Sequence, residues 1–203
     1  MSDGEIGRRG VLSGAGLLLA TPGLVVAQAK PQVAITTDKG VITLTLEPGK
    51  APVTTANFLR YVAAAKYDGG QFFRAARTKG APQLGSIVAS PNLRAQPYPA
   101  IGHEPTTKTG LRHKAGTISL GRFAPGTARG DFFICVSDLP YLDANPKAKG
   151  DNLGFAAFGQ VVSGMSVVRR ILAAPTSQES KFPEQRGQWL APPVRIISAK
   201  RIA

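Results

Sequence analysis

Residues 116–143 read GTISLGRFAPGTARGDFFICVSDLPYLD, and this stretch decides the fold. The β-rich run Thr117 to Leu120 is followed by a polar loop interrupted by Gly and Pro, and then by the apolar run Phe132 to Val136. An unbroken apolar run between turn signals predicts a strand buried on both faces. Because glycine lets another chain approach closely, the loop between the strands suits backbone contacts with a ligand. Taken alone, the pattern favours a plain hairpin of the core.

The segments before this stretch predict a β-hairpin and a helix. Residues 33–36 and 41–47 alternate apolar and polar side chains around a turn at residues 38–40 that contains Gly. Pro52 then opens a helical pattern with one apolar face, which we expect to end before Asp68.

The segments after it predict an exposed loop, a helix and a last strand. Residues 144–153 are polar and rich in Lys and Gly, which is typical of an exposed loop. A second helix is expected to open at Gly164-Met165. Residues 175–193 form a long loop rich in Pro and Gly, and Val194 to Ile202 is the expected last strand. No internal repeat is evident, so we expect a single domain.

The first 29 residues are expected to be a cleavable export signal rather than part of the fold. Arg8-Arg9, followed by Gly10 and two apolar residues, resembles the twin-arginine signal, and Ala27-Gln28-Ala29 is a small-x-small cleavage site. The alternative is an uncleaved N-terminal anchor. Cleavage would leave residues 30–203 as one domain, long enough to bury a core and located in the periplasm.

The chain is strongly basic, with a formal net charge of +13. Such a charge suggests nucleic-acid binding, but the basic residues are scattered, are not interleaved with aromatic residues and form no nucleic-acid motif. We therefore expect a solvated basic surface and no nucleic-acid partner. Weak attraction to an anionic membrane surface stays open as an alternative.

The residues that could bind a metal or a cofactor are few. Cys135 is the single cysteine, which excludes an internal disulfide, and its place in an apolar run predicts a core residue. The two histidines, His103 and His113, show no metal-ligand spacing, and no phosphate loop or dinucleotide fingerprint is present. We predict neither a metal nor a cofactor. His113 is expected to hydrogen-bond to loop backbone.

The central stretch resembles the cyclophilin family of peptidyl-prolyl isomerases. In that family a Gly-x-(Leu/Ile)-Ser run leads through a Gly- and Pro-containing loop to a Phe-Phe-Ile strand and a Leu-Asp pair. A second match is Tyr67 to Arg74, YDGGQFFR, which resembles the family's Tyr-Asp-Gly-x-x-Phe-(His/Tyr)-Arg. A third is Gly154 to Val162, which resembles the family's Phe-Gly-x-Val strand. The resemblance covers most of residues 32–202.

The resemblance implies a mainly β fold with helices, a closed antiparallel β-barrel of about eight strands capped by two helices. It implies an enzyme that accelerates rotation of Xaa-Pro bonds during the folding of exported proteins. The implied partners are proline-containing peptides and unfolded exported proteins, and we expect a monomer.

The resemblance also assigns roles to residues. Arg74 is the implied catalytic residue, braced by Gln83 if the segment Gln83-Leu84-Gly85 carries the family's glutamine. The competing match, Ile87 to Ser90, keeps the β-strand pattern but places Val88 at that position. The implied substrate-binding residues are Phe72, Leu120, Gly121, Arg122, Asp131, Phe133, Tyr141, Leu142 and Phe155.

The sequence departs from the family pattern at several of these positions. Phe155 stands in place of a pocket histidine, Asp131 in place of a glutamine, and Tyr141 where many members carry tryptophan. The family's pocket phenylalanine has no clear counterpart. The rival hypothesis is therefore a catalytically weak proline-peptide binding module or chaperone on the same fold. A basic scaffold for acidic partners is a third hypothesis, which rests on charge alone.

Overall fold

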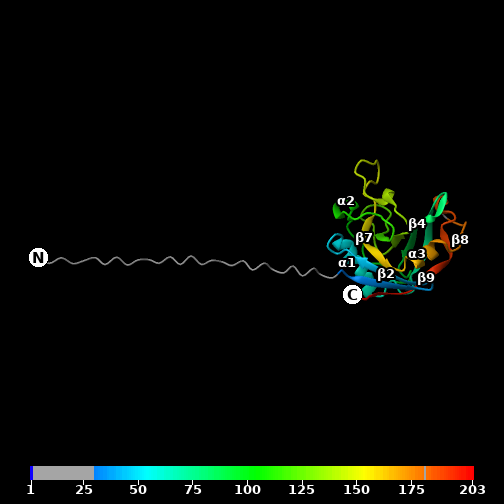
Figure 1. Cartoon of the computed structure of the whole chain (residues 1–203), viewed down its shortest axis with the longest axis horizontal. Coiled ribbons are helices and arrows are strands. Elements are labelled where there is room, and N and C mark those ends of the chain that lie inside the picture. The colour runs from blue at the N-terminus through cyan, green and yellow to red at the C-terminus, as the bar shows by residue number, and fades with distance from the viewer. Residues whose placement is uncertain (2–29, 181) are drawn as a thin grey trace.

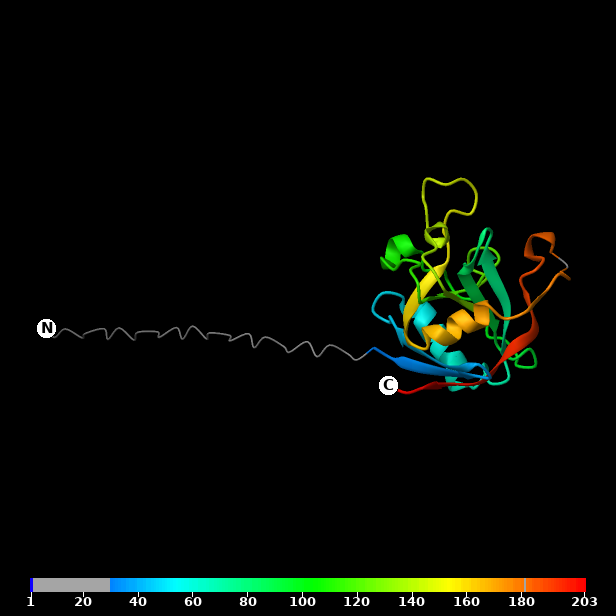
Figure 2. The ribbon, with the colours of Figure 1, turned by 45° about the vertical axis from the view of Figure 1, so that its right-hand side comes forward.

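The computed structural model of the protein describes residue 1, residues 30–180 and residues 182–203. In this part of the chain one nine-stranded antiparallel sheet has the order β1-β2-β7-β5-β6-β4-β3-β9-β8. A further pairing of β9 with β1 closes the sheet into a barrel, and the short β8 extends it beside β9. Figures 1 and 2 show the barrel with α1 and α3 against it. The predicted eight-stranded closed barrel is confirmed.

The predicted hairpin and the two predicted helices form, and so do the strands predicted on either side of the central loop. The strands are β1 Gln32–Thr37, β2 Gly40–Leu46, β3 Gln71–Thr78, β4 Ala81–Ser90, β5 Thr117–Leu120, β6 Phe132–Cys135, β7 Ala156–Ser163, β8 Thr176–Ser177 and β9 Trp189–Arg201. The helices are α1 Pro52–Ala63, α2 Thr106–Thr109 and α3 Met165–Leu172, and the 3₁₀ turns are η1 Pro140–Leu142 and η2 Pro183–Gln185.

Two differences from the prediction concern local elements. The short helix α2 was not among the two helices expected, and β9 begins at Trp189 rather than at Val194. The expected export signal lies outside the described residues, apart from Met1. Within the described residues, no helix combines the length and the apolar character that crossing a membrane requires.

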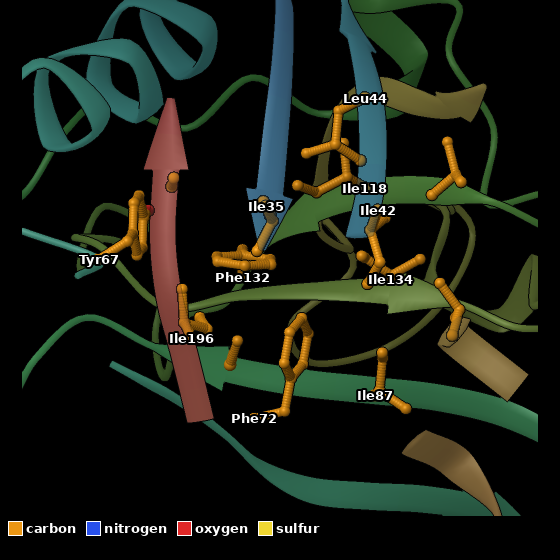
Figure 3. Packing of buried hydrophobic residues seen from close by; sticks show 14 of the residues in the cluster. Ile35, Ile42, Leu44, Tyr67, Phe72, Ile87, Ile118, Phe132, Ile134 and Ile196 are labelled. Atoms are coloured by element: carbon orange, nitrogen blue, oxygen red, sulfur yellow. The ribbon is translucent and has the colours of Figure 1, made fainter. Parts of the chain in front are cut away.

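The core fills the barrel interior with side chains from every long strand. Strand residues alternate between the two faces of a sheet, so every second residue points inward, and in these strands it is mostly apolar. Figure 3 shows Phe72, Ile87, Phe132 and Ile134 meeting in this interior. Phe132 packs edge-on against Phe72, with ring centroids 5.8 Å apart.

Helix α1 seals the barrel and fixes a loop that reaches the outer surface. Its Phe58 is fully buried, with ring centroids 5.2 Å from those of Tyr67 and Phe158. The Asn57 side-chain amide donates to the Arg129 carbonyl at 2.5 Å, and the Tyr67 hydroxyl donates to the next carbonyl, that of Gly130, at 2.8 Å. The packed core therefore anchors the loop that leads into β6.

Candidate active site

One row of residues crosses the outer face of the barrel on four neighbouring strands. Arg74 on β3 pairs with Val88 on β4, Val88 pairs with Phe133 on β6, and Phe133 pairs with Ser119 on β5. Two separate parts of the sequence, the Arg74 motif and the Phe-Phe-Ile strand, are thus brought into register. The row places a guanidinium beside an apolar floor.

The adjacent row points the opposite way, into the core. It consists of Phe72, Ala89, Phe132 and Leu120, each at most 1% exposed. Phe72 and Arg74 are two residues apart and would share a face in a regular strand. A register shift between them, on both the β4 and the β9 side, lets Phe72 face inward while Arg74 faces outward.

Three residues of the outer row, Arg74, Val88 and Phe133, line a groove of about 900 Å³. Its walls come from β3 and β4, from the loops that follow β4 and β5, from η1, and from the segment before β9. Eight of the predicted site residues line this groove: Arg74, Gly121, Arg122, Asp131, Phe133, Tyr141, Leu142 and Phe155. Burial raises the pKa of the Asp131 carboxyl group.

The floor of the groove is a small apolar cluster, separate from the barrel core. Phe133, Cys135 and Leu139 are its buried members, and Val88, Leu142 and Phe155 pack against them. Phe155 meets Phe133 edge-on, with ring centroids 5.3 Å apart. Cys135 is fully buried here, and burial raises the pKa of its thiol to about 12, so it is an inert packing residue as predicted. An apolar floor of this kind can hold a proline ring.

A chain of buried polar side chains supports the floor from below. His113 lies between Asp143 and Ser119, with Nδ1 2.7 Å from an Asp143 carboxylate oxygen and Nε2 2.9 Å from the Ser119 hydroxyl. Its ring stacks on Phe133 with centroids 5.7 Å apart. Burial lowers the pKa of His113, an effect that Asp143 opposes. The expectation that His113 bonds to loop backbone is wrong, because its ring partners are side chains.

Arg74 is held by a residue that the sequence prediction did not include. Its Nε and Nη2 donate to Oε1 of Gln188 at 2.9 and 2.7 Å. Burial lowers the pKa of Arg74, and the nearby carboxylate of Glu184 opposes that shift. Among the described residues, Nη1 of Arg74 has no protein partner. One edge of the guanidinium is therefore fixed and the other is available to the groove.

Arg122 fixes the opposite wall. It forms a two-pronged ion pair with Asp151, at 2.5 and 2.9 Å, and its Nε donates to the Gly154 carbonyl at 2.9 Å. Its guanidinium lies 5.1 Å from the centre of the Phe155 ring. The exposed loop predicted at residues 144–153 is thus tied to the pocket, although its tip projects from the barrel in Figure 2.

Three predicted site residues lie elsewhere. Phe72 and Leu120 are buried in the inner row, where a peptide in the groove cannot reach them, so their predicted substrate contact is wrong. Gln83 is exposed near the turn of the β3–β4 hairpin, and the bonds predicted between it and Arg74 go to Gln188 instead. The strand-pattern alternative, with Val88 across from Arg74, is the one that the structure shows.

Two further details correct or extend the prediction. The Gly121 N–H donates to the Asp131 carbonyl at 2.7 Å, so it is not free for a bound peptide.

Phe73 and Trp189 also line the groove, with ring centroids 5.3 Å apart. The position of Phe73 beside Arg74 in the motif was the one sequence signal that could have identified it.

Comparisons with known proteins agree with this geometry. A sequence model of the family described as cyclophilin type peptidyl-prolyl cis-trans isomerase/CLD matches residues 32–201. Peptidyl-prolyl cis-trans isomerase A of Dickeya dadantii is 33% identical over 177 residues, which cover 87% of each chain. A peptidyl-prolyl cis-trans isomerase of Acinetobacter baylyi is 32% identical over 189 residues, 91% of this chain and 90% of its own.

A solved structure shares the fold. The cyclophilin type peptidyl-prolyl cis-trans isomerase of Cryptosporidium parvum, crystallised in the presence of the dipeptide Ala-Pro, matches with a TM-score of 0.65 at 18% identity. The match covers 85% of this chain and 99% of that one. The closed barrel is thus the cyclophilin fold. The chain belongs to the cyclophilin-type peptidyl-prolyl cis-trans isomerase family, and it is an enzyme of that class.

Proposed function

We propose that the protein accelerates Xaa-Pro rotation in the groove through Arg74, with the apolar floor around Phe133 holding the proline ring. Rotation about a peptide bond is slow because resonance gives the C–N bond a barrier of about 18–20 kcal/mol. No covalent step is needed to lower that barrier. A catalyst has to favour the twisted amide over both planar forms.

A guanidinium can do this by donating a hydrogen bond to the prolyl nitrogen, whose lone pair becomes available as the amide twists. Such a bond is stronger in the transition state than in either ground state, so it increases turnover rather than binding. Arginine suits the task because its planar group stays charged and can be braced along one edge. The observation that carries the proposal is Arg74 with Nε and Nη2 fixed and Nη1 available beside Phe133.

The test is turnover of a short Xaa-Pro peptide, followed with a protease-coupled assay. Arg74→Ala should lower turnover about 100- to 1000-fold, as expected when one charged transition-state donor is lost. Arg77→Ala is the matched control, because Arg77 lies on the same strand but donates to the carbonyls of Leu172 and Ala174, away from the groove. It should cost stability while leaving turnover per folded molecule unchanged. Wild-type turnover in Arg74→Ala would refute the proposed mechanism.

The groove also favours a second function, binding of unfolded chains with weak turnover. The exposed aromatic side chains of the described residues all line this groove: Phe123 is 93% exposed, Tyr141 75% and Phe182 48%. Exposed apolar patches mark sites that bind other chains. Binding of Xaa-Pro peptides by wild-type protein without measurable turnover would establish this alternative.

We further propose that residues 1–29 are removed on export and that the enzyme acts in the periplasm on unfolded exported proteins. The support is the Arg8-Arg9 pattern and the Ala27-Gln28-Ala29 site. N-terminal sequencing of the protein recovered from the periplasm should begin at or near Lys30. A full-length product found only in the cytosol would contradict this.

A further inference from the structure

The position across from Arg74 on β4 carries no polar side chain. The backbone partner of Arg74 there is Val88, which cannot accept a hydrogen bond from the guanidinium. A half-buried guanidinium without acceptors is costly, since it has given up water without a replacement. The molecule therefore needs an acceptor from another segment, and Gln188 supplies it.

The orientation of the Gln188 amide is fixed by its second contact. Its Oε1 accepts both hydrogen bonds from Arg74, while its Nε2 donates to the Glu184 carbonyl at 2.9 Å. The reverse orientation would place the amide N–H groups against the guanidinium donors and its oxygen against a carbonyl. Only one orientation satisfies all three contacts.

The backbone of Gln188 is fixed as well. Its carbonyl accepts from the Ala75 N–H at 2.8 Å, and its N–H donates to the Gln185 carbonyl at 3.1 Å. The next residue, Trp189, pairs with Arg74 and donates its indole N–H to the Ser180 hydroxyl at 3.1 Å. The segment around η2 is thus folded onto β3 with Gln188 at a defined place.

We propose that Gln188, in the segment before β9, is the positioning residue for Arg74. It braces the guanidinium, a role that the family resemblance assigns to a glutamine that follows the catalytic arginine in the sequence. This inference rests on the proposed role of Arg74. Holding the Nε–Nη2 edge directs Nη1 toward the bound prolyl nitrogen. Because the prolyl nitrogen of a planar amide is a poor acceptor, the brace matters for turnover and not for substrate affinity.

The experiment measures kcat and KM of the full protein for an Xaa-Pro peptide. Gln188→Ala should lower kcat about 10- to 100-fold with KM nearly unchanged, the scale expected when a catalytic group is misplaced by about 1 Å. Gln188→Glu keeps an acceptor for Arg74 but loses the amide that donates to the Glu184 carbonyl, so kcat should fall less than in Gln188→Ala. Gln178→Ala, in the same segment but outside the groove lining, is the control and should behave as wild type.

A double-mutant cycle shows whether the effect passes through Arg74. Adding Gln188→Ala to Arg74→Ala should lower kcat no further, because the braced group is already gone. A further tenfold loss in that background, or full kcat in Gln188→Ala while Arg74→Ala is inactive, would overturn the inference. If Arg74→Ala itself keeps wild-type kcat, the proposed mechanism fails, which is a separate result. Recovery of kcat on adding Val88→Gln to Gln188→Ala would support the inference independently of loop folding.

Discussion

The two faces of the barrel wall made by β3, β4, β6 and β5 are built in different ways. On the inner face the strands supply apolar residues, among them Phe72, Ile87, Phe132 and Ile134, which meet in Figure 3, and Phe58 of α1 packs against them. On the outer face the strands supply Arg74, part of the walls and the floor around Phe133. The rest of that face comes from the loops that follow β4 and β5, from η1, from Phe155 just before β7 and from the segment before β9.

The difference shows what each face is constrained to do. The inner face has to fill a closed volume, which any well-packed set of apolar side chains in the right pattern achieves. The outer face has to hold Arg74 and Phe133 in a fixed relation while staying open to a peptide. Surface segments such as the one carrying Gln188 can meet that requirement without changing the strands.

The largest expected effects distinguish alanine substitutions at the neighbouring residues Phe132 and Phe133, one on the inner face and one on the outer face. Phe132→Ala removes a fully buried ring from the core and should lower the free energy of unfolding by about 3–5 kcal/mol, with turnover per folded molecule nearly unchanged. Phe133→Ala should cost less stability but much more turnover, because it removes the groove floor. Urea unfolding and the protease-coupled assay measure the two quantities. Equal effects of the two substitutions on both would contradict the distinction.

The inner face and several of the elements were accessible from the sequence. The apolar run Phe132 to Val136, the alternating hairpin of residues 33–47 and the helix opening at Pro52 all form where the patterns place them. These patterns indicate which side chains are buried, because buried residues recur with the period of a strand or a helix. The closed barrel itself came from the family resemblance, because closure depends on the pairing of β1 with β9, which no local pattern encodes.

The outer face was predicted only in part. Eight of the predicted residues line the groove because they belong to motifs with fixed spacing. Phe72 was misplaced because a register shift beside it breaks the alternation of β3, and a bulge leaves no clear sequence signal. Gln188 was missed because its contact joins residues 114 positions apart, through a loop whose path the sequence does not specify.

A smaller effect should come from the polar chain under the groove floor. His113→Asn leaves Ser119 and Asp143 without their shared partner and should cost about 1–3 kcal/mol at pH 7.5. The pKa of His113 is lowered in the folded protein, so below about pH 6.5 the unfolded chain binds a proton that the folded protein does not. Wild-type stability should therefore fall as the pH drops from about 6.5 toward the folded pKa, and this loss is absent in His113→Asn.

Denaturant unfolding at several pH values between neutral and mildly acidic measures this difference. A constant stability gap between wild type and His113→Asn across this pH range would show that the ring titrates alike in both states. The hydrogen bonds of His113 would then contribute to stability independently of pH in this range.

The smallest expected effect compares Ile87 and Val88, neighbours on β4 that point to opposite faces. Ile87 is fully buried in the core, so Ile87→Val removes one methylene from a closed volume and should cost about 0.5–1.5 kcal/mol. Val88 lines the groove and is only half-buried, so Val88→Thr should change stability by no more than about 0.5 kcal/mol, because its hydroxyl can face water in the groove. Urea unfolding resolves both values when the two variants are measured side by side. A larger loss for Val88→Thr than for Ile87→Val would mean that the groove floor excludes water as completely as the barrel interior. The outer face would then have to be regarded as a second core that a peptide enters only by displacing packed side chains.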